Sequence, residues 1–263
     1  METNMNKLSS IEVRNKARNG ENFTTSGLAQ GYVQTNVVII PKKDAFDFML
    51  YCQRNPKPCP LIEVFDPGDY ESNFAYKSDI RKDIPEYKIF KDGKFSSNST
   101  DITEFWRDDF VTFLLGCSFT FENELMKNGL DLPYFKQGKN VPMFITSIDT
   151  EKSGKFSGKM VVTQRWIPRE KLVRSIQITS RFPNQHGTPI QVGNSSEIGI
   201  EDPYKPDFGD PWIPENEELI PVYWACGVTP QIAIQEAKLE IMITHSPGKM
   251  FLTDLKDEDM AVI

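Results

Sequence analysis

The sequence has little of the residue type that most often transfers protons or binds metals: among 263 residues it contains only two histidines, His186 and His245. Its four cysteines are widely scattered, and neither a Cys-x-x-Cys pair nor a His-Glu-x-x-His motif occurs. We therefore expect no dedicated metal site. Disulfide frameworks are typical of short secreted domains, so we interpret these cysteines as reduced thiols of a cytoplasmic protein.

Long apolar runs and an excess of basic residues are also lacking. No segment approaches the roughly 20 apolar residues that cross a bilayer, and the N-terminal stretch METNMNKLSSIEVRNKARNGE has no apolar core of a secretory signal. The net charge of −7 disfavours nucleic acid and anionic membranes as partners, because both bind basic surfaces. Glycine-rich nucleotide motifs are missing, so we expect no cofactor. The expected partner is a small anionic substrate, and a homodimer is compatible with the sequence.

What is present is a folded α/β chain, with 39% hydrophobic and 25% charged residues. Near the N-terminus, YVQTNVVIIP (32–41), KKDAFDFMLYCQRN (42–55) and LIEVF (61–65) predict strand, helix and strand. Short joints between them indicate a βαβ unit with parallel strands. Near the C-terminus, PVYWA (221–225), TPQIAIQEAKL (229–239) and EIMITH (240–245) predict a second such unit.

The segment between these units has a different texture. Apolar residues from Trp106 to Cys117 recur at helical spacing and predict a helix that stops at Gly116, and SFTFENELMKNG (118–129) predicts the next one. Further on, two strands and a helix are predicted at 140–149, 158–168 and 169–182. We therefore expect a main α/β domain built from both chain ends, residues 1–125 and 205–263, with a smaller α+β segment, residues 126–204, inserted into it.

Eight longer segments carry more than generic α/β signals. They are RNPKPCPL (54–61), FLLGCSFTFE (113–122), NVPMF (140–144), GKMVV (158–162), ITSRFPNQHG (178–187), PDFGDP (206–211), PVYWACGVTPQ (221–231) and THSPGKMFLTDL (244–255). Together, from about Arg18 to Leu255, they resemble the D-glutamate cyclase family, whose bacterial members usually carry a hydro-lyase label. The resemblance implies a three-layer α/β sandwich with a smaller two-layer part. It also implies a lyase that closes an acidic amino acid, D-glutamate, to 5-oxo-D-proline with loss of water.

Such a reaction needs groups that hold two carboxylates, accept a proton from the ammonium group and donate one to the departing oxygen. Four cations of the matching segments are candidates for the carboxylates: Arg54, Lys57, Arg181 and Lys249. Arg54 and Lys57 follow a predicted helix end, where cations also simply neutralise the helix dipole. Arg181 precedes a loop, and its planar guanidinium suits a carboxylate.

His245 is the preferred acid or base. It closes the strand EIMITH, and ligands of open α/β sheets bind at the C-terminal ends of strands. The alternative is a partly buried histidine that is hydrogen-bonded in a turn. For His186 we expect no more than a role in shaping the loop before Gly187.

Two cysteines lie beside predicted helix starts. Cys226 ends the strand PVYWA, and Thr229 with Pro230 predicts the N-cap and first residue of the following helix. The N–H groups of Gly227, Val228 and Thr229 are therefore expected to bind an anion and to lower the pKa of the adjacent thiol. Cys117 has a comparable place beside Ser118, so we expect both turns to face one cleft.

These thiols remain open to more than one interpretation. Cys226 and Cys117 are candidate catalytic or pocket-lining thiols, and buried cysteine is also common as a small apolar residue. Two other functions are compatible with the same residues: a non-catalytic protein that binds small carboxylates, and a different thiol-dependent lyase or hydrolase.

Overall fold

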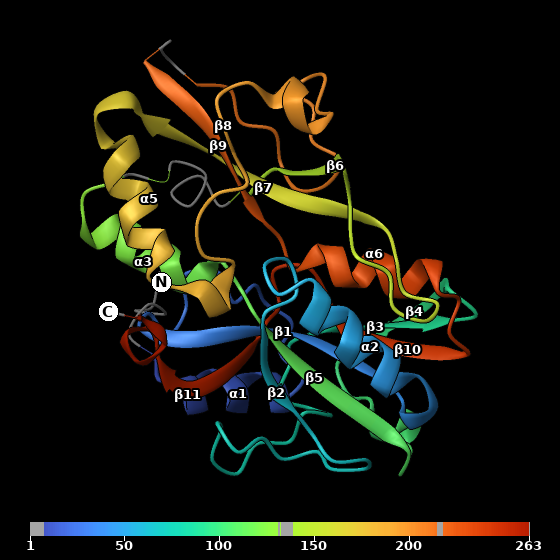
Figure 1. Ribbon diagram of the computed structural model, residues 1–263. Helices are drawn as coiled ribbons and strands as arrows, with labels where there is room; N and C mark the ends of the chain where they lie inside the picture. Colours follow the sequence, from blue (N-terminus) through green and yellow to red (C-terminus); the bar gives the residue numbers. More distant parts are fainter. Residues whose placement is uncertain (1–7, 131, 133–138, 215–217, 263) are drawn as a thin grey trace.

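The computed structural model describes residues 8–130, 132, 139–214 and 218–262, which form two β-sheets joined by helices (Figure 1). The larger sheet has seven strands in the order β2-β5-β1-β10-β3-β4, with β11 paired to β1. Its strands are β1 (Tyr32–Pro41), β2 (Leu61–Val64), β3 (Tyr87–Lys91), β4 (Lys94–Ser99), β5 (Phe110–Gly116), β10 (Ile241–His245) and β11 (Phe251–Lys256). Every pairing within it is antiparallel.

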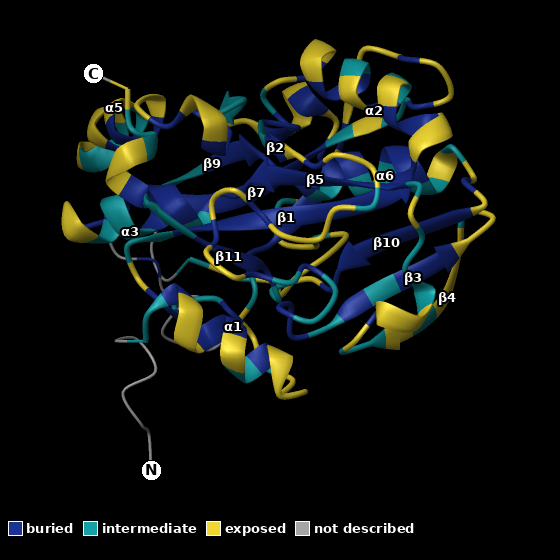
Figure 2. Cartoon of the chain, turned by 90° about the horizontal axis from the view of Figure 1, so that it is seen from below, coloured by how far each residue is buried: buried dark blue, intermediate teal, exposed yellow. Residues whose placement is uncertain are grey.

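β1 is the central strand of this sheet, and both of its faces are covered. Val38 and Ile40 pack against α2 (Lys42–Arg54) and α6 (Val228–Glu236), whereas Val37 and Ile39 pack against the segment 65–84. This alternation follows from the two-residue period of a strand. Figure 2 shows β1 and its neighbours buried and the outer faces of α1 and α2 exposed. The large sheet thus lies between two layers. The helices α2 and α6 cover one face, and a second cover, to which the segment 65–84 belongs, lies on the other face.

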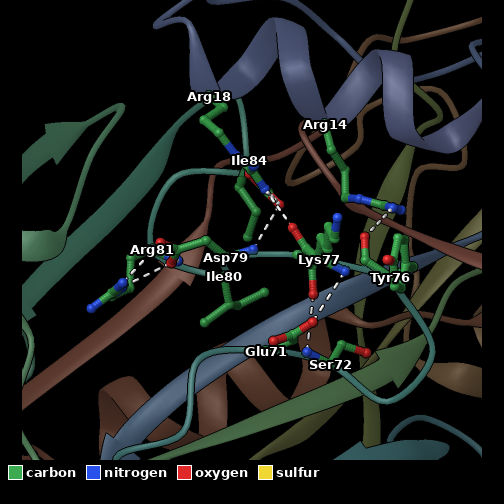
Figure 3. Close-up of polar contacts among 12 residues, drawn as sticks. Arg14, Arg18, Glu71, Ser72, Tyr76, Lys77, Asp79, Ile80, Arg81 and Ile84 are labelled. Atoms are coloured by element: carbon green, nitrogen blue, oxygen red, sulfur yellow. Dashed lines mark hydrogen bonds and ion pairs between the residues drawn. The ribbon is translucent and has the colours of Figure 1, made fainter.

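The second cover of the large sheet includes α1 (Ser10–Arg18), which begins with a capping box between Ser9 and Glu12. Val13 of α1 packs against Leu252 of β11. Two ion pairs fix the helix: Arg14 binds Asp254, and Arg18 binds Asp83 in the segment 71–84 (Figure 3). Arg14 is almost fully buried, so this pair specifies where α1 docks.

The smaller sheet has the order β6-β7-β9-β8 and is again antiparallel. Phe121 and Leu125 of α3, with Ile178 of α5, cover one of its faces around Trp224. Its elements are α3 (Phe119–Lys127), β6 (Met143–Asp149), β7 (Lys159–Pro168), α5 (Leu172–Ser180), β8 (Gln191–Val192) and β9 (Leu219–Ala225). Short 3-10 turns at Thr103–Phe105, Arg169–Lys171, Pro183–Gln185, Ser195–Ile198 and Asp257–Met260 complete the described elements.

The α/β class is confirmed, but the predicted helix from Trp106 to Gly116 is wrong. The segment forms β5, which is buried along its whole length. Phe113 and Leu115 pack on one face of the sheet, and Phe110 and Leu114 on the other. A strand that is buried on both faces is a continuous apolar run, and such a run also satisfies helical spacing.

The predicted parallel βαβ units are also wrong in detail. β1 and β2 do run in the same direction, since both pair antiparallel with β5, but β5 lies between them. β9 and β10 lie in different sheets, and α6 connects the sheets. The C-terminal segment 205–263 therefore contributes strands to both sheets, while the division of the chain into two domains stays a prediction.

Candidate active site

Two cysteine turns meet where the two sheets adjoin. Cys117 follows β5 and precedes α3, and Cys226 follows β9 and precedes α6. Both thiols line one cavity of about 50 Å³. Because β5 belongs to the large sheet and β9 to the small one, this cavity exists only through the packing of one sheet beside the other.

The cavity collects most of the predicted site residues. Cys117, Ser118, Cys226, Gly227, Val228 and His245 line it. His186, for which only a loop-shaping role was expected, lines it as well. Its remaining walls are Asn36, Phe119, Asn140, Val141, Met143, Thr163, Gln231, Pro247, Gly248 and Met250. Among the lining residues that the structure describes there is no lysine or arginine, and the donors that they offer to an anion are neutral.

Thr229 is not the N-cap of α6, and that prediction is wrong. Gly227 holds the cap position, and the Thr229 hydroxyl accepts a hydrogen bond from the Val161 amide over 2.9 Å. The side chain therefore fastens α6 to β7 instead of capping the helix. Gly227 and Val228 stay at the cavity, and the amide N–H groups of Ser118 and Gly227 have no hydrogen-bond partner among the described residues.

The predicted lowering of the thiol pKa values is wrong too. Burial raises the pKa of Cys117 to about 12 and that of Cys226 to about 11. Hydrogen bonds from the N–H groups of Phe119 and Val228 act in the opposite direction, but they are the smaller effect. Both sulfurs are therefore protonated at neutral pH, and neither is an activated nucleophile.

His245 on β10 is held by the backbone of the central strand. The Val37 amide donates a hydrogen bond to Nδ1 of His245 over 3.0 Å, and the Val37 carbonyl oxygen lies farther from the same nitrogen, at 3.4 Å. We assign the tautomer from the closer contact, in which Nδ1 accepts, so the neutral ring carries its proton on Nε2. Burial lowers the pKa of His245 to about 4, so the ring is neutral at pH 7. Its Nε2–H has no partner among the described residues and is available as a donor.

His186 has the opposite tautomer. Its Nδ1 lies 2.8 Å from the carbonyl oxygen of Lys57, which can only accept, so the proton is on Nδ1 and Nε2 carries a lone pair. Burial lowers the pKa of His186 to about 4 as well. The backbone of His186 is left-handed, with φ of +76°. Non-glycine residues in that region are uncommon and concentrate at functional sites.

Two glycines allow the close packing that builds the cavity. A Cβ atom at Gly116 would lie 1.8 Å from the carbonyl oxygen of Asn184, in the turn that carries His186. A Cβ atom at Gly227 would lie 2.3 Å from the side-chain nitrogen of Asn36. That nitrogen donates to the Gly116 carbonyl oxygen over 2.8 Å. Asn36 of β1 therefore joins both cysteine turns.

A buried ion pair supports the cavity from behind. Arg165 of β7 pairs with Glu122 of α3, and both side chains are fully buried. The guanidinium also donates to the hydroxyls of Ser118 and Thr163, over 2.9 Å each. The Ser118 hydroxyl thus accepts from Arg165, and its own hydrogen is left to donate into the cavity.

None of the four predicted cations lines this cavity, and Lys249 pairs with Glu86 over 3.1 Å. Arg54 donates to the Lys152 carbonyl oxygen, and the exposed Arg181 donates to that of Val262 over 3.4 Å. Lys57 lines a separate pocket, which shares His186 with the cavity.

Four polar residues of the site were missed: Asn36, Glu122, Thr163 and Arg165. For Asn36 and Arg165 the available signal was an amide or charged side chain inside an otherwise apolar strand, as in YVQTNVVIIP and GKMVVTQRWIP. Such residues are costly to bury unless they are paired, which makes them informative.

With the cavity described, comparisons with known proteins become informative. A model described as D-glutamate cyclase matches residues 111–254, which contain both cysteine turns and both histidines. The chain belongs to the D-glutamate cyclase family. A protein of Geobacillus kaustophilus, named "Putative hydro-lyase", is 50% identical over 97% of this chain and 98% of its own. Relatives with the same wording in their names occur in Thermoanaerobacter (51% identity, 98% of each chain) and Stutzerimonas stutzeri (49%, 97% of each chain).

The D-glutamate cyclase family is one of carbon–oxygen lyases, and the protein is a hydro-lyase of that family. A crystal structure of a nitrogen repressor-like protein from Methanococcus jannaschii aligns with 89% of this chain and 91% of its own, at 15% identity and a TM-score of 0.39. Within residues 8–130, 132, 139–214 and 218–262, no helix is long and apolar enough to span a membrane. The same residues contain no group of three or more His, Cys, Asp or Glu placed to hold a metal ion.

Proposed function

We propose that this hydro-lyase closes D-glutamate to 5-oxo-D-proline at the cavity between the cysteine turns. The reaction forms a bond between the amino nitrogen and the side-chain carboxyl carbon and breaks one carbon–oxygen bond of that carboxyl. Two protons leave the nitrogen and two reach the departing oxygen, which leaves as water. The site therefore needs a proton carrier and a donor for the oxyanion that develops during attack.

The observation that carries the proposal is the opposite tautomers of two histidines in one cavity. The Nε2 lone pair of His186 accepts a proton from the ammonium group and, as imidazolium, returns it to the departing oxygen. A second proton then moves from the nitrogen to the departing oxygen by the same route. Two protons have then reached that oxygen, and the imidazole ring is neutral again. Nε2–H of His245 donates a hydrogen bond to the oxyanion. A neutral imidazole is a suitable donor for this task because it stabilises charge without giving up its proton.

Neutral donors would hold the substrate carboxylates. The N–H groups of Ser118 and Gly227 lie at the N-termini of α3 and α6, where the helix dipoles favour an anion. The Ser118 hydroxyl, oriented by Arg165, adds a third donor. Of the binding residues expected from the sequence, this proposal keeps Ser118, Gly227 and Val228 at the substrate. Arg54, Arg181 and Thr229 have no part in it.

The cavity must widen to admit an amino acid. A volume of about 50 Å³ holds one or two water molecules. Met143 and Met250 form part of the wall, and methionine side chains adapt to irregular spaces with little strain. We expect these two side chains to move when substrate binds.

The direct test is incubation of the purified protein with D-glutamate and, separately, L-glutamate, with 5-oxoproline followed by chiral chromatography. Turnover of the D-enantiomer is expected. His186→Gln should lose at least about a hundredfold in kcat, since it removes the proton carrier. His245→Gln keeps an amide N–H donor and should lose less.

Two outcomes would overturn the proposal. Stabilisation of the protein by D-glutamate without any product would instead indicate a protein that only binds small carboxylates. Turnover that survives His186→Gln at the wild-type rate would remove the proton carrier from its role.

A further inference from the structure

A second pocket of about 450 Å³ shares His186 with the proposed active site. α2, the loop 55–61 and the turn 183–188 form its walls. His186 lines both this pocket and the cavity with the two cysteine turns. The pocket thus adjoins the smaller cavity and is large enough for an amino acid or its lactam.

One lysine gives this pocket its charge. The ammonium group of Lys57 donates to the Thr188 hydroxyl over 2.7 Å. No aspartate or glutamate lines the pocket, and Lys57 has no ion pair with any residue in the described ranges. Lys57 is half-buried, and the loss of water around its ammonium group lowers its pKa.

Lys57 differs from the exposed Lys94, which also lacks an ion pair within the part of the chain that the structure describes, because it is half-buried. With a net charge of −7, the chain has an excess of carboxylates, yet none of those in the described ranges pairs with this lysine. Partial burial without a counter-charge costs free energy, and an anion in the pocket would offset that cost. An ammonium group has three donors, so the bond to Thr188 leaves two for a ligand.

The backbone of the same residue links this lysine to the active site. The Lys57 carbonyl oxygen accepts the proton of His186 Nδ1 and so fixes the tautomer of that ring. Movement of Lys57 toward a ligand would therefore change the hydrogen bond between its carbonyl oxygen and His186. Gly187 follows His186 and continues the turn that carries Thr188.

We propose that the Lys57 pocket binds the carboxylate of a small organic acid, on its way to or from the cavity beyond His186. This inference rests on the proposed function only for the identity of the acid. The binding itself requires Lys57, Thr188 and the pocket, and it does not require turnover.

Calorimetric titration tests the pocket separately from catalysis. D-glutamate and 5-oxo-D-proline would be titrated into the wild type, into Lys57→Met and into Lys94→Met. Lys94 is exposed, makes no ion pair in the described ranges and lies on β4, so its variant loses the same charge outside the pocket. Lys57→Met should weaken carboxylate binding by about ten- to a hundredfold, the usual worth of a hydrogen bond to a charged group. Lys94→Met should bind as the wild type does.

Three results would overturn the assignment: no measurable carboxylate binding by the wild type, equal affinities in Lys57→Met and the wild type, or equal losses in both lysine variants. Inorganic phosphate is the probe for a general anion site, and competition by phosphate at the same affinity would remove the carboxylate assignment. His245→Gln leaves the pocket intact and should still bind. A wild type that forms 5-oxoproline while Lys57→Met binds normally would refute the pocket and leave the proposed function standing.

Discussion

The backbone amide of Val37 donates to Nδ1 of His245 over 3.0 Å, closer than the Val37 carbonyl oxygen at 3.4 Å, and this bond assigns the proton of the neutral ring to Nε2. The equivalent bond of His186 runs the other way, to the carbonyl oxygen of Lys57 over 2.8 Å. Backbone groups cannot change their roles as donor or acceptor. Two residues of one type are thereby given different chemistry, one as a hydrogen-bond donor and one as a base.

The first prediction concerns stability against pH. Burial lowers the pKa of both histidines to about 4, from the ordinary value of 6.5. The unfolded chain therefore takes up protons below pH 6.5 that the folded chain does not. Their contribution to stability is complete above pH 6.5 and is lost as the pH falls toward 4, by up to about 1.4 kcal/mol per pH unit for each histidine.

Urea unfolding at pH 7.5 and pH 5.0 checks this. The loss of stability on acidification should be smaller for the His186→Gln/His245→Gln double variant than for the wild type. Burial raises the pKa of Asp257 to about 6, so this carboxyl group stabilises the folded chain as the pH falls. This effect is opposite to that of the histidines, and it is equal in both proteins. Identical losses in the two proteins would show that neither histidine is buried in its neutral form.

The second prediction concerns Gly116. An alanine there would place its Cβ atom against the Asn184 carbonyl oxygen and push away the turn that carries His186. Turnover should fall about a hundredfold, because displacement of a catalytic group by about 1 Å is enough for such a loss. The assay is 5-oxoproline formation, with circular dichroism to establish that the variant is folded.

Gly158→Ala is the matched control for this change. Its Cβ atom would have no neighbour closer than 3.8 Å, and the backbone there has no positive φ. It should retain both fold and turnover. Full activity in Gly116→Ala would mean that the turn 183–187 does not position His186 for the reaction.

The sequence predicts the turns and the strand end of this site better than it predicts the buried polar residues that hold them in place. The turns at Cys117 and Cys226, and the strand end at His245, can be found locally because each depends on a few adjacent residues. The pairing of Arg165 with Glu122 depends on how β7 and α3 pack, which no local pattern reports. Burial is likewise a tertiary property, so a helix start beside Cys226 suggested a lowered pKa where desolvation raises it.

The misassigned segment shows a related limit. From Phe110 to Gly116 every residue is buried, so the sequence carries no alternation to distinguish a strand from a helix. His186 was underestimated for another reason. Its loop gives no indication that His186 lines the same cavity as His245, which is 59 positions further along the chain.

The third prediction concerns the buried ion pair. Arg165→Met removes a guanidinium that binds Glu122, Ser118 and Thr163, and it should reduce the free energy of unfolding by about 3–5 kcal/mol. Lys159→Met is the control on the same strand, since Lys159 pairs with Asp149 at the surface and should cost at most about 1 kcal/mol. Chemical denaturation measures both.

A double variant separates charge from packing at this pair. Arg165→Met/Glu122→Leu removes both charges and should recover part of the stability lost in Arg165→Met. It should not recover turnover, because the Ser118 hydroxyl is no longer oriented toward the cavity. Equal stabilities of Arg165→Met and Lys159→Met would contradict the importance of this pair.

The last prediction concerns the two thiols at the cavity. With pKa values of about 11 and about 12, Cys226 and Cys117 have fewer than about one thiolate in a thousand at pH 7.5. Iodoacetamide should therefore leave the folded protein almost unmodified, whereas all four cysteines should react after unfolding in guanidinium chloride. Cys226→Ala and Cys117→Ala should keep turnover within a fewfold of the wild type, since each thiol only fills space. Rapid inactivation of the folded protein by iodoacetamide, prevented by Cys226→Ser, would instead favour the thiol-dependent lyase or hydrolase that the sequence left open.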